Sequence, residues 1–79
     1  MTDLKETLHG IACAIVDHPD EVTVTEGDSR GKDIDLILSV AESDMGMVIG
    51  KNGKIAKAIR TVMKAAAATD GKRVNVEIR

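Results

Sequence analysis

The spacing of apolar residues changes repeatedly along this chain of 79 residues, and those changes constrain the fold more than any other feature. A spacing of three or four residues places side chains on one side of a helix, whereas a spacing of two places them on one face of a strand. The chain therefore has the predicted order helix, strand, strand, helix, helix, strand. A chain this short builds one core, so we expect a single α+β domain over residues 1–79, with helices packed on one face of a small sheet.

The first predicted element is an amphipathic helix near the N-terminus. It begins after Thr2 or Asp3, and Pro19 is expected to end it. Glu6 lies three residues after Asp3, which is typical of a helix N-terminal capping pattern. The apolar stripe of this helix consists of Leu4, Leu8, Ile11 and Ile15.

Three segments with alternating apolar residues predict the strands. The first two, 21–26 and 32–40, are joined by a short polar loop and should pair antiparallel. In the second strand Ile37 is the exception, because it is apolar on the outward side. The last strand follows a helical crossover, which is long enough for parallel pairing. Its inward residues are Val74, Val76 and Ile78. We expect a mixed three-stranded sheet with the strand 32–40 in the centre.

Two helical segments lie between the second and third strands. The first, 42–49, is short and has Ser43 or Asp44 as its predicted cap. The second begins at Lys54 and stops near residues 69–71. Its predicted buried face consists of Ile55, Ile59, Val62 and Ala66. Its opposite side carries Lys57, Arg60 and Lys64.

Charge is distributed unevenly along the chain. Residues 1–49 hold 3 basic and 11 acidic side chains, a net of -8, whereas residues 50–79 hold 8 basic and 2 acidic ones, a net of +6. A protein with one basic region and an acidic remainder can bind a polyanion locally. A helix that exposes its lysines to solvent explains the pattern equally well, so charge alone leaves both interpretations open.

The composition excludes several classes of protein. The chain has no Phe, Trp or Tyr, which excludes sites that stack bases on aromatic rings, such as those of RRM domains. No apolar run approaches the roughly 18 residues that a membrane span needs. The N-terminal sequence lacks a secretory signal pattern, so we expect a cytoplasmic protein. No convincing nucleophile–base pair is present, and we expect no enzyme.

The single cysteine does not indicate a disulfide framework or a metal site. Cys13 has no intrachain partner, and its expected role is that of a small, partly buried or interface residue. His9 lies four residues before it on the predicted helix, but a structural zinc needs four ligands and His18 would supply at most a third. We therefore expect no metal and no cofactor.

The segment 47–55, MVIGKNGKI, carries the chemistry that points to a function. Gly50 and Gly53 lie between two helical segments, with Lys51 inside the loop and Lys54 directly after it. Glycine permits a tight turn and lets a ligand approach the backbone. The first N–H groups of the next helix lack intrahelical partners, so a phosphate placed there meets these donors, the helix dipole and both lysines. An ordinary helix–helix turn with two glycines is the alternative interpretation.

Two other interpretations of this segment fail. A hairpin turn at the Asn-Gly pair is disfavoured because the flanking residues have helical rather than alternating spacing. A nucleotide-binding P-loop is excluded because Asn52 stands where Ser or Thr must hold magnesium.

The sequence VIGKNGKI resembles the KH-domain signature, in which a hydrophobic pair precedes Gly-x-x-Gly and a helix follows, here with a further isoleucine at Ile59. The predicted order of elements is similar to that of bacterial type II KH domains over essentially the whole chain. With the continuation IAKAIR, the sequence resembles the small single-KH RNA-binding proteins of bacteria, the KhpA type.

The resemblance implies a groove for about four single-stranded nucleotides, whose backbone lies on the loop 50–53. In similar domains the loop between the first two strands forms the other wall, here residues 27–32, where Asp28 departs from a basic rim. Ile49 and Ile37 are the candidates for the apolar floor. The full set of implied RNA-binding residues is Ile49, Gly50, Lys51, Asn52, Gly53, Lys54, Lys57, Arg30, Lys32 and Ile37.

The resemblance also implies partners besides single-stranded RNA. Similar proteins form homodimers and pair with a larger KH-domain protein, and the implied role is that of a post-transcriptional regulator or RNA chaperone. The expected dimer surface lies near Met45, Met47 and the start of the next helix, or around Cys13. A protein-interaction module is the alternative function. A DNA-binding helix-turn-helix is disfavoured, because strands intervene where that fold has helices.

Overall fold

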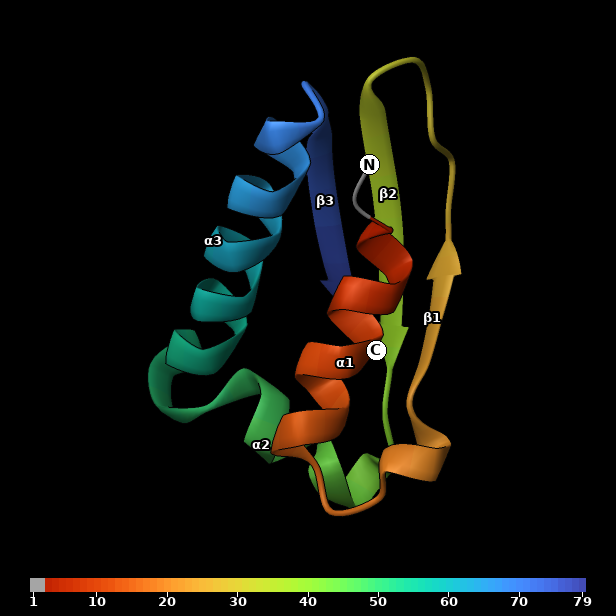
Figure 1. The fold of residues 1–79 in the computed structure, drawn as a ribbon. Coiled ribbons are helices and arrows are strands. Elements are labelled where there is room, and N and C mark those ends of the chain that lie inside the picture. The colour runs from red at the N-terminus through yellow and green to blue at the C-terminus, as the bar shows by residue number, and fades with distance from the viewer. Residues whose placement is uncertain (1–2) are drawn as a thin grey trace.

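The computed structural model describes residues 3–79, which form a three-stranded sheet with helices on one face (Figure 1). Short 3-10 turns at Pro19–Glu21, Glu42–Asp44 and Lys51–Gly53 connect the main elements. These elements are α1 (Leu4–Ile15), β1 (Thr23–Glu26), β2 (Asp33–Ser39), α2 (Met45–Ile49), α3 (Lys54–Thr69) and β3 (Arg73–Ile78). The predicted α-β-β-α-α-β order is confirmed.

The sheet has the order β1-β2-β3, with β2 in the centre as predicted. β1 is antiparallel to β2, with Thr23 opposite Ser39, and β3 is parallel to β2, with Asp33 opposite Arg73. The short loop between β1 and β2 permits only antiparallel pairing, whereas α2 and α3 return the chain for parallel pairing. β3 is therefore an edge strand with one free side.

α1 begins as predicted but ends earlier. The carboxylate of Asp3 caps the helix, because its Oδ1 accepts a hydrogen bond of 3.1 Å from the backbone N–H of Glu6. Thr2, the other predicted start, lies outside the described residues. The expectation that Pro19 ends the helix is wrong: α1 stops at Ile15, and Pro19 opens a separate 3-10 turn. Proline suits that first position because no N–H is needed there.

The buried face of α3 differs from the prediction. Ile59 is buried as expected, but Ile55 and Val62 are 38% and 51% exposed. The buried residues are Ala56, Ile59, Met63 and Ala67, three of them one position further along the chain than predicted. Small alanine side chains let α3 approach the sheet and α1 closely, so packing selects this face over the one with the larger apolar residues.

The core between the helices and the sheet is entirely aliphatic, apart from the thioether of Met63. Leu8, Leu36, Leu38 and Val48 are essentially inaccessible to solvent. Inward residues of β2 alternate with Asp35 and Ile37, which lie on the face that no helix covers. No helix within residues 3–79 has the length and apolar character to span a membrane.

Candidate nucleic-acid interface

Three of the four residues in the loop between α2 and α3 have a positive φ. Gly50 has φ 73° and ψ 173°, Asn52 has φ 58° and Gly53 has φ 74°. Only glycine adopts the conformation of Gly50 at low cost, and asparagine is one of the few other residues that tolerates a positive φ. The glycine–lysine–asparagine–glycine sequence therefore fits a sharp turn that reverses the chain between two helices.

Gly50 also needs to lack a side chain. A Cβ added at this position would lie 2.3 Å from Cγ1 of Ile55 and 3.0 Å from its backbone nitrogen, whereas nothing lies within 4 Å of a Cβ added at Gly53. The loop is thus folded back against the first turn of α3. Lys51 and Asn52, which lie between the two glycines, are exposed.

The N-terminal turn of α3 has the charge to attract an anion. No side chain caps this helix at Gly53, and its first turn contains no acidic residue. The first N–H groups of a helix carry a partial positive charge, and the exposed ammonium groups of Lys51, Lys54 and Lys57 lie in and beside the same loop. Backbone donors and side-chain cations here can act together on a phosphate group.

The buried carboxylate of Asp44 lies directly before α2. Asp44 is 1% exposed and was predicted as a helix cap, but its side chain makes no capping hydrogen bond. Instead, Oδ2 accepts hydrogen bonds from the backbone N–H of His18 at 2.9 Å and from its ring Nδ1 at 3.1 Å. Asp44 therefore occupies the predicted N-cap position of α2, but a partner 26 residues away provides the donors that this buried carboxylate needs.

The same contact perturbs the protonation of His18. The hydrogen bond to Asp44, followed by the negative charge of that carboxylate, raises the pKa of the His18 ring above its ordinary value of 6.5. Glu21 and Asp17 add smaller contributions in the same direction, and partial desolvation opposes them. The pair joins the segment after α1 to the start of α2, and α2 carries Gly50 at its C-terminal end.

Arg30 and Lys32 lie away from the 50–53 loop. They belong to the connection between β1 and β2, at the opposite end of β2 from α2 (Figure 1). Arg30 is exposed and lies 3.6 Å from the carboxylate of Asp28, which offsets part of its charge. The structure therefore does not bring these two cations together with the loop residues.

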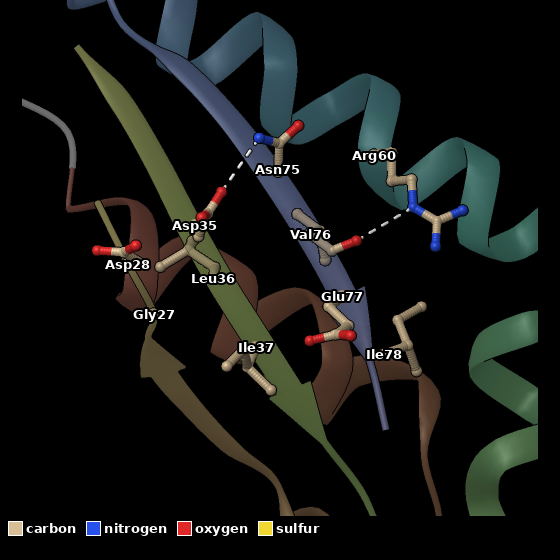
Figure 2. A pocket seen from close by; sticks show the side chains of 10 residues that line it. All are labelled: Gly27, Asp28, Asp35, Leu36, Ile37, Arg60, Asn75, Val76, Glu77 and Ile78. Carbon is tan, nitrogen blue, oxygen red and sulfur yellow. Dashed lines mark hydrogen bonds between the residues drawn. The ribbon is translucent and has the colours of Figure 1, made fainter. Parts of the chain in front are cut away.

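Ile37 and Ile49 lie in different layers of the domain, so the structure does not bring these two candidates for the groove floor together. Ile37 lines a hollow of about 480 Å³ on the open face of the sheet, together with Asp35 and Glu77 (Figure 2). Ile49, which is 39% exposed, ends α2 in the helical layer. The alternation of side chains along β2 causes the separation, because the buried Leu36 and Leu38 force Ile37 to the other face.

Arg60 has a role that the sequence pattern did not reveal. Its Nε donates a hydrogen bond of 3.3 Å to the backbone carbonyl of Val76, on the free edge of β3 (Figure 2). Two guanidinium nitrogens remain beyond this bond. The only sequence signal was the position of Arg60 on the basic side of α3, between Lys57 and Lys64.

The metal-ligating candidates are not assembled into a site. The sulfur of Cys13 lies 3.6 and 3.7 Å from the ring nitrogens of His9, and His18 is bound to Asp44 instead. Within residues 3–79 there is no group of three or more His, Cys, Asp or Glu side chains that could hold a metal ion.

Comparison with known proteins identifies the family of this chain. Residues 5–78 match the family model described as "KhpA/KhpB, KH domain". The "RNA-binding protein KhpA" of Clostridium acetobutylicum is 57% identical over 75 residues, which cover 95% of this chain and 99% of that protein. The protein of the same name from Halalkalibacterium halodurans is 48% identical, over 95% of this chain and 97% of the relative.

Solved structures support the same fold. A crystal structure of Era in complex with MgGDPNP and nucleotides 1506–1542 of 16S ribosomal RNA matches with a TM-score of 0.73 at 20% identity. The match covers 95% of this chain and 28% of the Era chain. Era from Aquifex aeolicus bound to GDP·AlF4⁻ matches with a TM-score of 0.70, also at 20% identity, over 95% of this chain and 29% of that one. From its sequence and its type II order of elements, the chain belongs to the KhpA/KhpB family of KH domains.

Proposed function

We propose that this protein binds single-stranded RNA and that the loop 50–53 holds the phosphodiester backbone. The observation that carries the proposal is the loop itself. Two glycines with positive φ bring the backbone N–H groups at the start of α3 next to Lys51 and Lys54, with no acidic side chain in the first turn. Such an arrangement attracts phosphate through hydrogen bonds, the helix dipole and two cations.

The relatives support this proposal. Several share the name RNA-binding protein KhpA, and the family is not one of enzymes. We infer a groove for about four nucleotides beside the loop, with affinity directed mainly at the backbone because the chain has no aromatic ring on which bases could stack. Post-transcriptional regulation or RNA chaperoning in the cytoplasm is the cellular role that fits such binding.

The double substitution Lys51→Asp with Asn52→Asp tests the proposal. Two carboxylates would replace a cation and an amide where phosphates must lie, so binding to single-stranded RNA should be lost in a filter-binding titration. Both side chains are exposed, and aspartate tolerates the positive φ at position 52, so circular dichroism should show an intact fold. Unchanged affinity would refute the loop as the binding site.

A matched control changes the same net charge elsewhere. Lys5 and Ser43 are exposed residues outside the loop, and the double variant Lys5→Asp with Ser43→Asp also lowers the net charge by three units. Binding by this control should stay within a few-fold of the wild type. An equal loss in both double variants would mean that overall charge, and not the loop, determines the affinity.

Self-association is a second proposal, and exposed apolar side chains favour it. Met47, Ile49, Ile55 and Val62 are 37% to 51% exposed, and all four lie on α2 and α3. A domain of this size buries only about 60% of its unfolded surface, so covering this patch in a homodimer would stabilise it. A larger KH-domain protein is the alternative partner, since one family model covers both KhpA and KhpB.

Light scattering tests self-association. A solution at micromolar concentration should give about twice the monomer mass of 8.4 kDa, and Val62→Asp should give the monomer. A strictly monomeric wild type would contradict the homodimer and favour the larger partner.

A further inference from the structure

We propose that the contact between His18 and Asp44 is a pH-dependent latch, which positions α2, and through it the 50–53 loop, for RNA binding. This inference rests on the proposed function of that loop. Neither side chain belongs to the loop, so both act as positioning residues. The connection after α1 passes the start of α2 at this contact, in the lower part of Figure 1.

The carboxylate of Asp44 takes its donors from one residue. Oδ2 accepts hydrogen bonds from the backbone N–H of His18 at 2.9 Å and from the ring Nδ1 at 3.1 Å, and Oδ1 lies 3.3 Å from the same ring nitrogen. Asp44 is almost inaccessible to solvent, so bulk water cannot replace these donors. A buried carboxylate without donors or a compensating charge is costly. The folded position of Asp44, directly before α2, therefore depends on His18.

α2 needs such an anchor because it is short. Its five residues, Met45–Ile49, are far fewer than an isolated helix needs to be stable in water, so tertiary contacts hold it in place. Val48 is the one buried residue of α2, whereas Met47 and Ile49 are partly exposed. The contact of Asp44 with His18 thus adds a second anchor at the first turn of the helix.

The C-terminal end of α2 leads directly into the loop. The N–H of Gly50 donates a hydrogen bond of 2.9 Å to the carbonyl of Gly46, and Gly50 packs against Ile55 at the start of α3. A displacement of α2 therefore shifts Gly50 relative to Ile55 and disturbs the turn that carries Lys51. Because only molecules with an intact loop bind RNA, the apparent affinity falls with the fraction of such molecules.

Acidic groups from three segments act on the ring of His18. They are Asp44 before α2, Glu21 in the 3-10 turn and Asp17 after α1. The hydrogen bond to Asp44, followed by the charge of that carboxylate, raises the pKa of the ring, the other two carboxylates add to this, and desolvation opposes it. From α1, the thiol of Cys13 contacts the carbonyl of Pro19, the next residue, at 3.7 Å. The surroundings of the ring therefore favour its protonated form.

The charge of the ring determines the strength of the latch. Below the raised pKa, His18 and Asp44 form an ion pair, and this pair is lost as the pH rises through that value. The neutral ring can still donate from Nδ1, but it no longer offsets the buried negative charge. The ring is 49% exposed, so it exchanges protons with solvent while the protein stays folded. The latch is therefore closed at mildly acidic pH and weakened at alkaline pH.

The pH profile of RNA affinity tests the latch. Fluorescence anisotropy at constant salt would follow a tetraadenylate between pH 6 and pH 8.5, a range in which neither adenine nor the phosphodiester titrates. We expect the wild type to bind about fivefold more weakly at pH 8.5, the lower end of typical coupling between two sites. His18→Asn keeps a neutral donor and should lose this dependence. His9→Gln removes the other histidine of the chain and should keep it.

A merely structural role for the pair would give a different result. It would move the unfolding midpoint with pH but leave the affinity of the folded protein unchanged, and circular dichroism at both pH values checks that the protein is folded. A flat wild-type profile, or an unchanged profile in His18→Asn, would overturn the latch.

The reciprocal effect of RNA on His18 gives a second readout. If a weakened latch lowers RNA affinity, RNA must raise the pKa of His18 by the logarithm of the same factor, which the ring Cε1 proton reports in a nuclear magnetic resonance titration. The negative charge of RNA also acts on the ring through space. Asp44→Asn keeps this field but removes the ion pair, so the RNA-induced change should disappear in this variant, and a change of wild-type size would overturn the latch.

Failure of the proposed function has a separate signature. It would appear as full tetranucleotide binding by Lys51→Asp with Asn52→Asp at both pH values. If Asp44→Asn does not fold, the comparison of His18→Asn with His9→Gln still decides whether the latch exists.

Discussion

Replacing Gly50 by alanine is expected to destabilise the protein far more than the same change at Gly53, although both glycines belong to one loop. Gly53 lies in the left-handed helical region, with φ 74° and ψ 15°. A residue with a Cβ pays about 1–2 kcal/mol there. Because nothing lies within 4 Å of the added Cβ, no steric cost is added.

At Gly50 two costs combine. Its φ of 73° and ψ of 173° belong to a region that is essentially restricted to glycine, at about 1–3 kcal/mol for other residues. The new Cβ would also lie 2.3 Å from Cγ1 and 2.9 Å from Cβ of Ile55. Rotation of the side chain can relieve the first contact but not the second, and overpacking of this kind costs about 1–3 kcal/mol. The sum of about 2–6 kcal/mol is a large part of the roughly 4–12 kcal/mol expected for a domain of this length.

Urea unfolding followed by far-ultraviolet circular dichroism measures both variants. We expect a clearly lower unfolding midpoint for Gly50→Ala than for Gly53→Ala, at an unchanged slope. Adding Ile55→Ala to Gly50→Ala removes Cγ1 and should recover part of the loss, but not all, because the Cβ contact persists. Equal losses at the two glycines would refute the close packing of Gly50 on α3.

Three further results are expected. Because Asp44 raises the pKa of His18, the stabilisation of the folded state by this pair is fully present below the unfolded value of about 6.5 and is lost as the pH rises through the raised value. The urea midpoint of the wild type should therefore fall between pH 6 and pH 8.5, and a fall of equal size in His18→Asn would contradict this. Met63 is fully buried, so Met63→Ala should lower the free energy of unfolding by about 2–5 kcal/mol. Val62 is half exposed, so Val62→Ala should lower it by about 0.5 kcal/mol or less in the monomer. Similar losses in the two variants would argue against the observed buried face of α3. Tetranucleotide binding should weaken with salt at a log–log slope of roughly -2 to -3, and a salt-independent affinity would indicate apolar recognition instead.

The sequence predicted the elements whose signals are local. Strands with alternating residues, the glycine-rich loop and the capping carboxylate of Asp3 each depend on neighbours within a few positions, and the structure has them close to the predicted bounds. The start of α3 at Lys54 belongs to this group as well. The parallel pairing of β3 with β2 followed from the length of the crossover alone.

The features that the sequence did not predict depend on distant partners. Ala56 and Met63 are buried in place of Ile55 and Val62, so helical periodicity favoured the wrong face of α3. Asp44 has the residue type and position of a helix cap, and only the fold shows that His18 takes its carboxylate. Ile37 lies on the outward face of β2 as the alternation predicted, and only the fold shows that Ile49, the other candidate for the groove floor, lies in the helical layer.

RNA binding by the loop 50–53 is tested most directly by a nuclear magnetic resonance titration of the protein with a single-stranded tetraribonucleotide. The proposed contact predicts that the largest backbone amide shifts fall on residues 50–55, where the loop meets the first turn of α3. The shifts should shrink as salt is added, since phosphate contacts dominate. Shifts concentrated on the open face of the sheet around Ile37 and Glu77, with the loop amides unmoved, would contradict binding at the loop.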